Sequence, residues 1–319
     1  DPYVLSVNPT VTTSYTLVSV TQANGCSNAG SGTGTVTVNP LSAIVTQPVS
    51  KTVCPDDNVN FSVSATGISL TYQWQFNTVP IAGATNNVLN INNVDNTDEG
   101  AYRCIVSSTC GPAITSSVAN LTLYTQTSIT TQPTDLTVCQ GNNANFHVVA
   151  AGTGLTYQWK RNGVNISDGG AYSGTTSDNL VITGAATSNA GTFTCLITGT
   201  CGDETTDPAI LTVNEKIVIT TQPIGKSVCP GTNTSFSVAV TGTSPTYQWQ
   251  LNNANIAGAT SATLTLTSVS AANAGNYKCI ITGICGAVTS NQVQLVVYTD
   301  VSISAQPSDY SSCEGTNAK

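Results

Sequence analysis

Two short stretches of sequence decide the fold: Tyr72-Gln73-Trp74, and Gly100-Ala101-Tyr102-Arg103-Cys104, whose cysteine follows the tryptophan by thirty residues. Both stretches return in the same order. Tyr-Gln-Trp recurs at 157–159 and 247–249, and Gly-x-Tyr/Phe-x-Cys recurs at 191–195 and 275–279. The three tryptophans are 85 and then 90 residues apart. Repetition at such a fixed period indicates tandem structural units.

Further features keep their order around these two stretches. Thr-Gln-Pro stands at 46–48, 131–133 and 221–223, with Ala-Gln-Pro at 305–307. A cysteine follows each of them six residues after the proline, and a Cys-Gly pair follows each Gly-x-Tyr/Phe-x-Cys run. These cysteines are Cys54, Cys139, Cys229 and Cys313 in the first set, and Cys110, Cys201 and Cys285 in the second.

Each unit has the pattern of β-strands. Apolar Phe61, Val63 and Ala65 alternate with polar residues, and the same alternation places Tyr72 and Trp74 on one face of a strand. Gly, Asn, Asp and Pro separate such runs at intervals of roughly 8–12 residues, which is typical of an all-β sandwich. No helical periodicity longer than one turn is present, so the sequence predicts an all-β protein.

The composition excludes several classes of function. Only 8% of the 319 residues are charged, against about 25% in ordinary soluble proteins, and the net charge is −8. A nucleic-acid partner is excluded because binding phosphate needs a clustered basic surface. No apolar run approaches the roughly 18 residues that cross a bilayer, so direct membrane insertion is not expected.

The eleven cysteines are regularly spaced and none forms a Cys-x-x-Cys pair. This pattern argues against zinc ribbons and thioredoxin-type redox sites, and favours disulfides in an oxidising, extracellular or cell-surface setting. Because the number is odd, at least one cysteine is free or has its partner outside this chain.

The repeated motifs resemble immunoglobulin-like domains, in which the tryptophan lies on strand C and the tyrosine forms a corner at strand F. More narrowly, the string V-C-x-G … Y-Q-W … G-x-Y-x-C … C-G is similar to the tandem repeats of large secreted surface proteins of Bacteroidetes-type bacteria, including gliding-motility adhesins exported by the type IX system. The resemblance implies tandem immunoglobulin-like β-sandwiches arranged end to end. It implies a core built around Trp74, Trp159, Trp249, Tyr102, Phe193, Tyr277, Cys104, Cys195 and Cys279.

On this basis we expect three complete repeats, at 41–124, 125–214 and 215–298. Residues 1–40 look like the C-terminal part of a preceding Ig/PKD-like module, and residues 299–319 look like the first strand of a following one. The usual disulfide partner on strand B is missing, since valine stands there at 63, 148 and 238. Cys104, Cys195 and Cys279 are therefore interpreted as small buried hydrophobic residues that pack on tryptophan.

The remaining cysteines lie at the two ends of each expected sandwich. A disulfide needs Cα atoms within about 7 Å, so neither Cys54–Cys110 nor Cys104–Cys110 fits inside one repeat. We therefore predict disulfides between neighbouring repeats, Cys54–Cys201 and Cys139–Cys285. A distorted first strand that lets Cys54 reach Cys104 is the alternative. Disulfides to flanking modules are predicted for Cys26, Cys110, Cys229 and Cys313.

The sequence offers no constellation for catalysis, a metal or a cofactor. His147 is the only histidine and lies between two inward-facing residues, so its side chain is expected to point to solvent. The acidic groups Asp56/Asp57, Asp95/Asp98/Glu99 and Asp203/Glu204/Asp207 are candidate calcium ligands, but capping of turns is favoured for all three. An inserted loop around Tyr172 in the second repeat is interpreted as tolerated variation.

The sequence therefore predicts a non-catalytic extracellular segment, a stalk or fibre of a large bacterial surface adhesin. Its expected partners are neighbouring immunoglobulin-like modules of the same or identical chains, with surface glycans as a further candidate. Two alternatives stay open: a subunit of a self-assembling extracellular filament, and a spacer or carbohydrate-binding array of a secreted polysaccharide-degrading enzyme.

Overall fold

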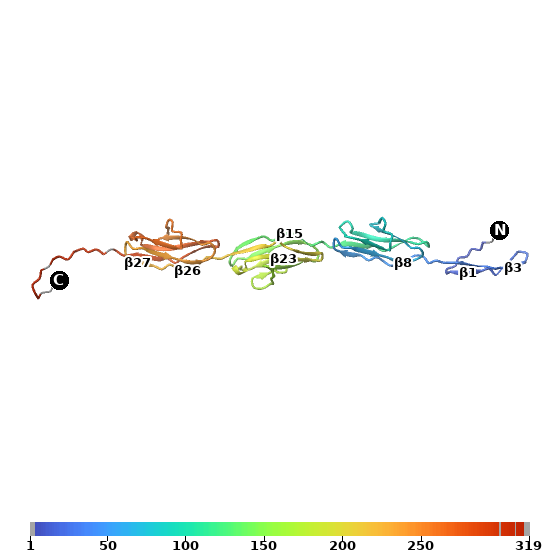
Figure 1. Ribbon diagram of the computed structural model, residues 1–319, viewed down its shortest axis with the longest axis horizontal. Helices are drawn as coiled ribbons and strands as arrows, with labels where there is room; N and C mark the ends of the chain where they lie inside the picture. Colours follow the sequence, from blue (N-terminus) through green and yellow to red (C-terminus); the bar gives the residue numbers. More distant parts are fainter. Residues whose placement is uncertain (1–3, 300, 310, 316–319) are drawn as a thin grey trace. The chain divides into compact units, whose positions relative to one another are not determined.

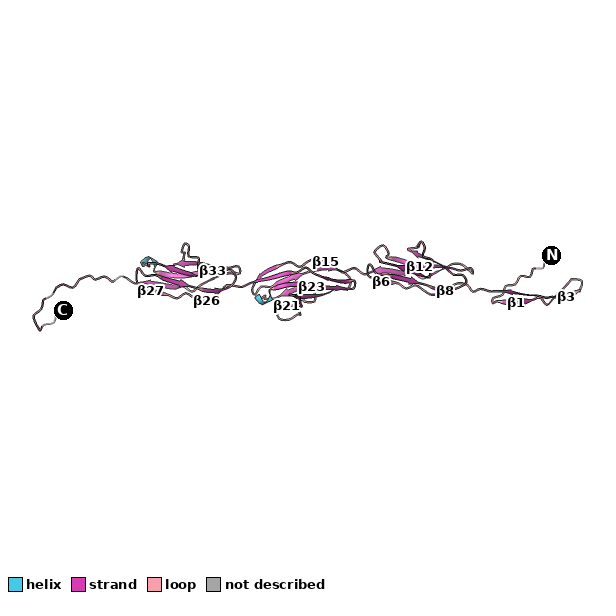
Figure 2. Ribbon diagram, viewed as in Figure 1, coloured by secondary structure: helices cyan, strands magenta, loops and turns pink. Residues whose placement is uncertain are grey.

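A computed structural model describes residues 4–299, 301–309 and 311–315. Three β-sandwiches account for most of these residues (Figures 1 and 2). We call them repeats 1, 2 and 3. In the part of the chain described, the helical segments are two 3-10 turns of three residues, η1 (Thr187–Asn189) and η2 (Ala271–Asn273).

Repeat 1 has one large sheet in the order β10-β9-β12-β14-β6, with β13 paired to β12, and two small pairs, β5–β8 and β7–β11. The pair β6–β14 is parallel, and the other pairs of the large sheet are antiparallel. The strands are β5 (Ala43–Thr46), β6 (Lys51–Val53), β7 (Val59–Ser62), β8 (Ser64–Thr66), β9 (Thr71–Phe76), β10 (Val79–Pro80), β11 (Val88–Ile91), β12 (Gly100–Ser107), β13 (Ile114–Thr115) and β14 (Ala119–Leu123).

Repeat 2 keeps this plan, with a large sheet in the order β16-β25-β23-β19-β20 and β24 paired to β23. An additional strand, β21, joins β17 and β22 in a three-stranded sheet. The strands are β15 (Ser128–Thr131), β16 (Leu136–Cys139), β17 (Ala144–His147), β18 (Val149–Ala151), β19 (Thr156–Arg161), β20 (Val164–Asn165), β21 (Tyr172–Ser173), β22 (Asn179–Ile182), β23 (Gly191–Gly199), β24 (Gly202–Thr205) and β25 (Ala209–Asn214).

Repeat 3 returns to the plan of repeat 1, in the order β27-β35-β33-β30-β31 with β34 paired to β33, and the pairs β26–β29 and β28–β32. The strands are β26 (Val218–Thr221), β27 (Lys226–Val228), β28 (Thr234–Ser237), β29 (Ala239–Thr241), β30 (Thr246–Leu251), β31 (Ala254–Asn255), β32 (Thr263–Leu266), β33 (Gly275–Gly283), β34 (Gly286–Thr289) and β35 (Val293–Val297).

The segments that flank the repeats are simpler. Before repeat 1, β1 (Thr13–Thr16) pairs with β4 (Thr33–Val36), and β2 (Ser19–Thr21) pairs with β3 (Ser27–Ala29). The strand expected within 299–319 is not formed by its described residues, 299, 301–309 and 311–315. A strand needs a neighbouring strand to pair with, and none of these residues belongs to a sheet.

Each core is built on the tryptophan. Trp74, Trp159 and Trp249 are fully buried, as are the β12, β23 and β33 cysteines Cys104, Cys195 and Cys279. Cys104 lies directly opposite Trp74 in the β9–β12 ladder, and Cys279 lies opposite Trp249 in repeat 3. Val63, Val148 and Val238 are also buried, so apolar packing occupies the place of the usual disulfide.

The tyrosine corner is present where the residue is tyrosine. The hydroxyl of Tyr102 donates to the carbonyl oxygen of Asp98 at 2.8 Å, and that of Tyr277 donates to Asn273 at 2.7 Å. In repeat 2 Phe193 occupies this place, stacked on Phe146 with ring centroids 4.9 Å apart, and has no hydroxyl to donate. Phe193 thus keeps the aromatic packing of the tyrosine corner but lacks its hydrogen bond.

The glycine of Gly-x-Tyr/Phe-x-Cys has a steric cause. Gly100 has φ +156°, and a Cβ there would lie 2.6 Å from a ring carbon of Phe76 and 2.7 Å from Oδ1 of Asn77. That oxygen accepts a hydrogen bond from the amide of Ala101 at 2.9 Å, which fixes its position. A residue with a Cβ would have to displace the Phe76 and Asn77 side chains, so glycine fits this position.

Replacing Tyr102 by phenylalanine is expected to cost repeat 1 about 1 kcal/mol, because the Asp98 carbonyl loses its donor. Buried Cys104 reports this locally. In moderate urea, its modification by a maleimide, followed by mass spectrometry, should accelerate about fivefold in Tyr102→Phe. Cys195 and Cys279 are matched internal controls in repeats 2 and 3. An equal acceleration at all three cysteines would contradict the local role of the hydroxyl.

The same hydroxyl makes the stability of repeat 1 depend on pH. Burial, and then the Asp98 carboxylate, raises the pKa of Tyr102 to about 12, from 10.0 for the free side chain. Because the folded pKa is the higher one, the stabilisation is complete below pH 10 and is lost as pH rises from 10 to 12. The ratio of Cys104 modification rates between Tyr102→Phe and wild type should therefore fall above pH 10. A ratio that rises there would show the opposite sign.

Candidate functional site: the disulfide-linked junctions

The first junction begins where β6 ends. Cys54 follows Val53, whose carbonyl oxygen accepts a hydrogen bond from the amide of Tyr124 at 2.9 Å. Tyr124 follows β14, which leads the chain out of repeat 1. Since β6 and β14 are parallel, their C-terminal ends lie together, and Cys54 sits beside the departing chain. The Asp57 carboxylate accepts from the Cys54 amide at 3.0 Å and holds the turn.

Cys201 supplies the other half from the turn between β23 and β24. The next residue, Gly202, has φ +99°, a left-handed conformation that glycine adopts without strain and that the Cys-Gly motif provides. Cys201 is 7% exposed, and its carbonyl oxygen accepts from the amide of Thr127 in the connecting segment at 3.4 Å.

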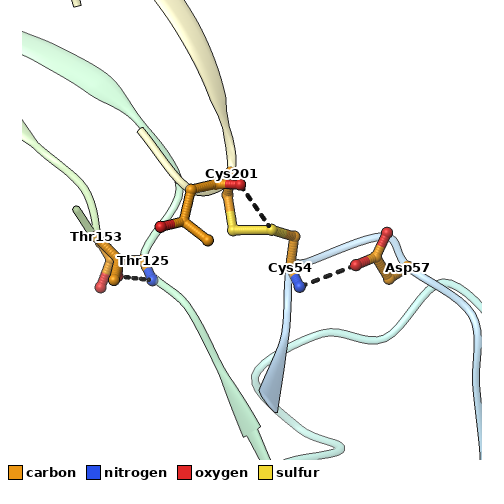
Figure 3. The surroundings of a disulfide bond; sticks show 6 residues. Cys54, Asp57, Thr125, Thr153 and Cys201 are labelled. Carbon is orange, nitrogen blue, oxygen red and sulfur yellow. Dashed lines mark hydrogen bonds between the residues drawn. A yellow bond between two sulfur atoms is a disulfide. The ribbon is translucent and has the colours of Figure 1, made fainter. Parts of the chain in front are cut away.

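Cys54 and Cys201 are joined by a disulfide, with Cα atoms 5.5 Å apart (Figure 3). This is a pair that the sequence predicts, and Cys104, the alternative partner, is buried and unbonded. A reciprocal pair of hydrogen bonds supports the junction. The amide of Thr125 donates to Oγ1 of Thr153 at 2.9 Å, and the amide of Thr153 donates to the Thr125 carbonyl at 3.1 Å.

The second junction repeats this arrangement. Cys139 ends β16, directly opposite Asn214 at the end of parallel β25, and Cys285 lies between β33 and β34. Their disulfide has a Cα–Cα distance of 5.6 Å and is the other predicted pair. Glu215 and Thr243 make the same reciprocal bonds as Thr125 and Thr153, at 2.8 and 3.2 Å.

The chain divides into two compact units, and each disulfide lies within one of them. One compact unit comprises 1–129, 150–156 and 197–204, and so contains Cys54 and Cys201. The other comprises 130–149, 157–196 and 205–319, and contains Cys139 and Cys285. Each junction therefore belongs to a single compact unit, although its two cysteines come from different repeats.

One residue of each connection is buried. Thr127 is 4% exposed in the first connection, and Ile217 is 5% exposed at the same place in the second. Gly152 and Gly199 approach Thr127, and Gly242 and Gly283 approach Ile217. The Thr127 hydroxyl has no hydrogen-bond partner, so its burial relies on packing alone. Each connection is thus short, bonded and packed.

Three of the cysteines assigned to flanking modules are free thiols. Cys26 and Cys229 are exposed, and Cys110 is half-buried. The fourth, Cys313, is exposed. Cys229 occupies the place in repeat 3 that Cys54 and Cys139 occupy before it, and Cys110 occupies the place of Cys201 and Cys285. The pairing of these cysteines with other modules stays a prediction.

The buried thiols are poor nucleophiles. Desolvation raises the pKa of Cys104 and of Cys195 to about 11, and raises that of Cys279. The thiolate is the reactive form of cysteine, so these groups are inert at neutral pH. They serve the core, as the sequence indicates.

Four of the eight acidic residues considered as calcium ligands accept hydrogen bonds from backbone amides: Asp57, Asp95, Asp98 and Glu99. Asp98 accepts from the amide of Asp95 at 3.1 Å, and Asp95 accepts from Thr97 at 2.7 Å. Glu99 accepts from the amide of Leu123 at 2.6 Å, near the first junction. Asp203 and Glu204 are exposed. Among the described residues, no group of three or more His, Cys, Asp and Glu side chains could hold a metal ion.

Two other candidates have plain structural positions. His147 is exposed at the end of β17. Tyr172 is half-buried, and its phenol oxygen accepts hydrogen bonds from Arg161 at 3.1 Å and Asn189 at 3.2 Å. The inserted loop is therefore held against repeat 2 by its tyrosine.

The sequence favours capping of turns for Asp57 and Glu99, but it does not predict that these two residues, with Thr153 and Thr243, complete the junctions. Asp57, Glu99, Thr153 and Thr243 all bond backbone atoms there. Asp57 is the acidic residue three positions after Cys54, a spacing typical of a capped turn, and this was the available signal. Nothing in the spacing of Thr153 or Thr243 indicated their partners, which lie 28 residues away.

Cutting the first connection should leave the chain in one covalent piece. A site-specific protease sequence inserted after Gln126 would be cleaved between Cys54 and Cys201. The two fragments should migrate together on a non-reducing denaturing gel and separate when reductant is added. The control carries the same insertion with Cys54→Ser and Cys201→Ser, and should separate without reductant. Separation of the wild-type pieces without reductant would disprove the linkage.

Comparison with known proteins supports the fold. The family described as "Immunoglobulin domain" matches residues 128–198 and 217–282. Roundabout homolog 2 of Homo sapiens is 27% identical over 57% of this chain and 14% of its own length. Contactin-1a of Danio rerio is 33% identical over 39% of the chain and 13% of its own length. Endoglucanase C of Cellulomonas fimi is 31% identical over 32% of the chain and 10% of its own length.

Solved structures agree. The I-band fragment I67-I69 of titin superposes with a TM-score of 0.69, covering 83% of this chain and all of that fragment at 16% identity. The N-terminal eight immunoglobulin domains of Down Syndrome Cell Adhesion Molecule give 0.54 over 92% of this chain and 44% of that structure, at 18% identity. The curated relatives above are matched over no more than 14% of their length. The chain carries tandem immunoglobulin-like β-sandwich domains.

Proposed function

We propose that the chain is a non-catalytic extracellular segment, a stalk or fibre of a larger surface protein, which spaces other parts of that protein from the cell. The observation that carries this proposal is the disulfide at both junctions between repeats. Each bond restricts a connection that is already short and hydrogen-bonded. A tandem array that is stiff at its connections suits projection.

The disulfides also support the location. Structural disulfides persist in oxidising compartments and are rare where thiols are kept reduced. The similarity to Roundabout homolog 2 and Contactin-1a supports the same extracellular setting. Within the described residues, no helix has the length and apolar character needed to span a membrane.

A finer proposal concerns the type of protein. The repeated V-C-x-G … Y-Q-W … G-x-Y-x-C … C-G string supports a Bacteroidetes-type surface adhesin of the gliding-motility, type IX-secreted kind. Its partners would be further immunoglobulin-like modules, joined through Cys26, Cys110, Cys229 and Cys313, with surface glycans as ligands. The buried, weakly acidic thiols of Cys104, Cys195 and Cys279 support a role without covalent catalysis.

A second candidate function is a spacer or carbohydrate-binding array of a polysaccharide-degrading enzyme. The similarity to Endoglucanase C favours it, over 107 residues. A third, a self-assembling filament, is favoured by the free thiols of Cys110 and Cys229 at places equivalent to bonded cysteines. Chain-to-chain disulfides would then replace those to flanking modules.

The test is the size and location of the natural protein. An antibody against this chain should label intact, unpermeabilised source cells, and should detect a band of several hundred kilodaltons under reducing, denaturing conditions. A band near 32.6 kDa would overturn the stalk and favour the filament. A secreted band that cleaves polysaccharide in a gel overlay would favour the enzyme array. Labelling only after permeabilisation would contradict every extracellular role.

A further inference from the structure

The two disulfides overlap along the chain. One closes the loop from Cys54 to Cys201 and the other closes the loop from Cys139 to Cys285, with separations of 147 and 146 residues. Residues 139–201 belong to both loops. The first loop contains the connection between repeats 1 and 2, and the second contains the connection between repeats 2 and 3. Every connection between described repeats is therefore bridged by a second covalent route.

The strand pairing decides where tension would act without these bridges. In repeat 1 the chain enters through β5 and β6 and leaves from the end of β14, which is parallel to β6. Pulling on the chain termini would draw β6 and β14 in opposite directions along their own axes. The hydrogen bonds between Leu121–Leu123 and Lys51–Val53 would then resist the pull, and repeat 1 would unravel once they broke.

The Cys54–Cys201 disulfide relieves the hydrogen bonds between β6 and β14 of this tension. Tension that reaches β6 passes from Cys54 directly to Cys201 in repeat 2, without crossing a hydrogen-bonded strand pair. Residues 55–123, most of repeat 1, lie outside this route. At the second junction Cys139 ends β16 beside the end of parallel β25, so repeat 3 is tied to both strand ends, by the disulfide and by the backbone.

We propose that the two overlapping disulfides form a continuous covalent route for tension, which lets force bypass most of repeats 1 and 3 and sets a limit on how far the chain can be stretched. The shortest route runs along residues 1–54, crosses to Cys201, returns to Cys139, crosses to Cys285 and ends at 319. It contains about 150 residues, or about 530 Å at roughly 3.5 Å per extended residue.

Loss of disulfides lengthens this route unequally. With either bond alone, the shortest route contains about 170 residues, or about 610 Å. With neither, all 319 residues are extensible, to about 1,120 Å. Breaking the first bond thus releases about 80 Å, and breaking the second releases about 510 Å, whichever bond breaks first. Two loops that did not overlap would give two large steps instead.

Single-molecule stretching of the oxidised chain tests the proposal. The chain is tethered by peptide tags at its two termini that use no thiol chemistry, and is held at a force that unfolds all unprotected repeats. Extension should stop at about 530 Å, the length of the shortest covalent route. Adding dithiothreitol should then produce a step of about 80 Å followed by one of about 510 Å, for an overall increase of about twofold.

Variants identify the steps. Cys54→Ser with Cys201→Ser, and separately Cys139→Ser with Cys285→Ser, should start at about 610 Å and show only the large step. The matched control, Cys110→Ser with Cys229→Ser, removes two thiols outside the disulfides and should behave as wild type. The readout is a contour length, so once the remaining disulfide has formed it does not depend on whether the repeats stay folded under force.

Two outcomes would overturn the proposal. One is extension of the oxidised wild-type chain to the full length of the unlinked polypeptide before reductant is added. The other is a pair of equal steps after reductant is added, which two separate loops would produce. Neither outcome depends on the cellular role proposed above.

Discussion

The structure depends on one contact, the parallel pairing of the second strand of each repeat with its last strand. β6 with β14, β16 with β25 and β27 with β35 each bring two strand ends to the same edge. One of these ends carries the cysteine, and the other carries the chain into the connection. Without this pairing, Cys54 and Cys139 would not stand beside the places where the chain leaves a repeat. The disulfides follow from the sheet.

Much of the fold can be predicted from the sequence because apolar residues alternate along the strands and the motifs recur at a regular spacing. Alternation along 100–107 places Tyr102, Cys104 and Val106 on one face, and all three are buried. The even spacing of the motifs also limits which cysteines can meet, because residues at opposite ends of one sandwich are too far apart to bond. The disulfide pairs could therefore be predicted from the sequence alone.

Local departures from the strand pattern could not be predicted from the sequence. The run from Phe61 to Ala65 has the pattern of one strand, but it changes partner at Val63: β7 pairs with β11 and β8 pairs with β5. The glutamine of Tyr-Gln-Trp alternates outward, yet Nε2 of Gln73 donates to the carbonyl oxygens of Trp74 and Ile81 at 2.9 and 2.8 Å. Such bonds depend on loops whose paths follow from the completed fold, so strand periodicity carries no signal for them.

The buried thiols have a consequence for how the molecule is made. The polypeptide is synthesised from its N-terminus, so Cys54 is made well before its partner Cys201. Four other cysteines are made between them: Cys104, Cys110, Cys139 and Cys195. Once repeat 1 has folded, burial of Cys104 opposite Trp74 keeps this thiol from competing for Cys54, although Cys110 stays half-buried. Cys195 is buried in the core of repeat 2 in the same way. The hydrophobic core thus limits which thiols of a folded repeat can compete for the disulfides between repeats.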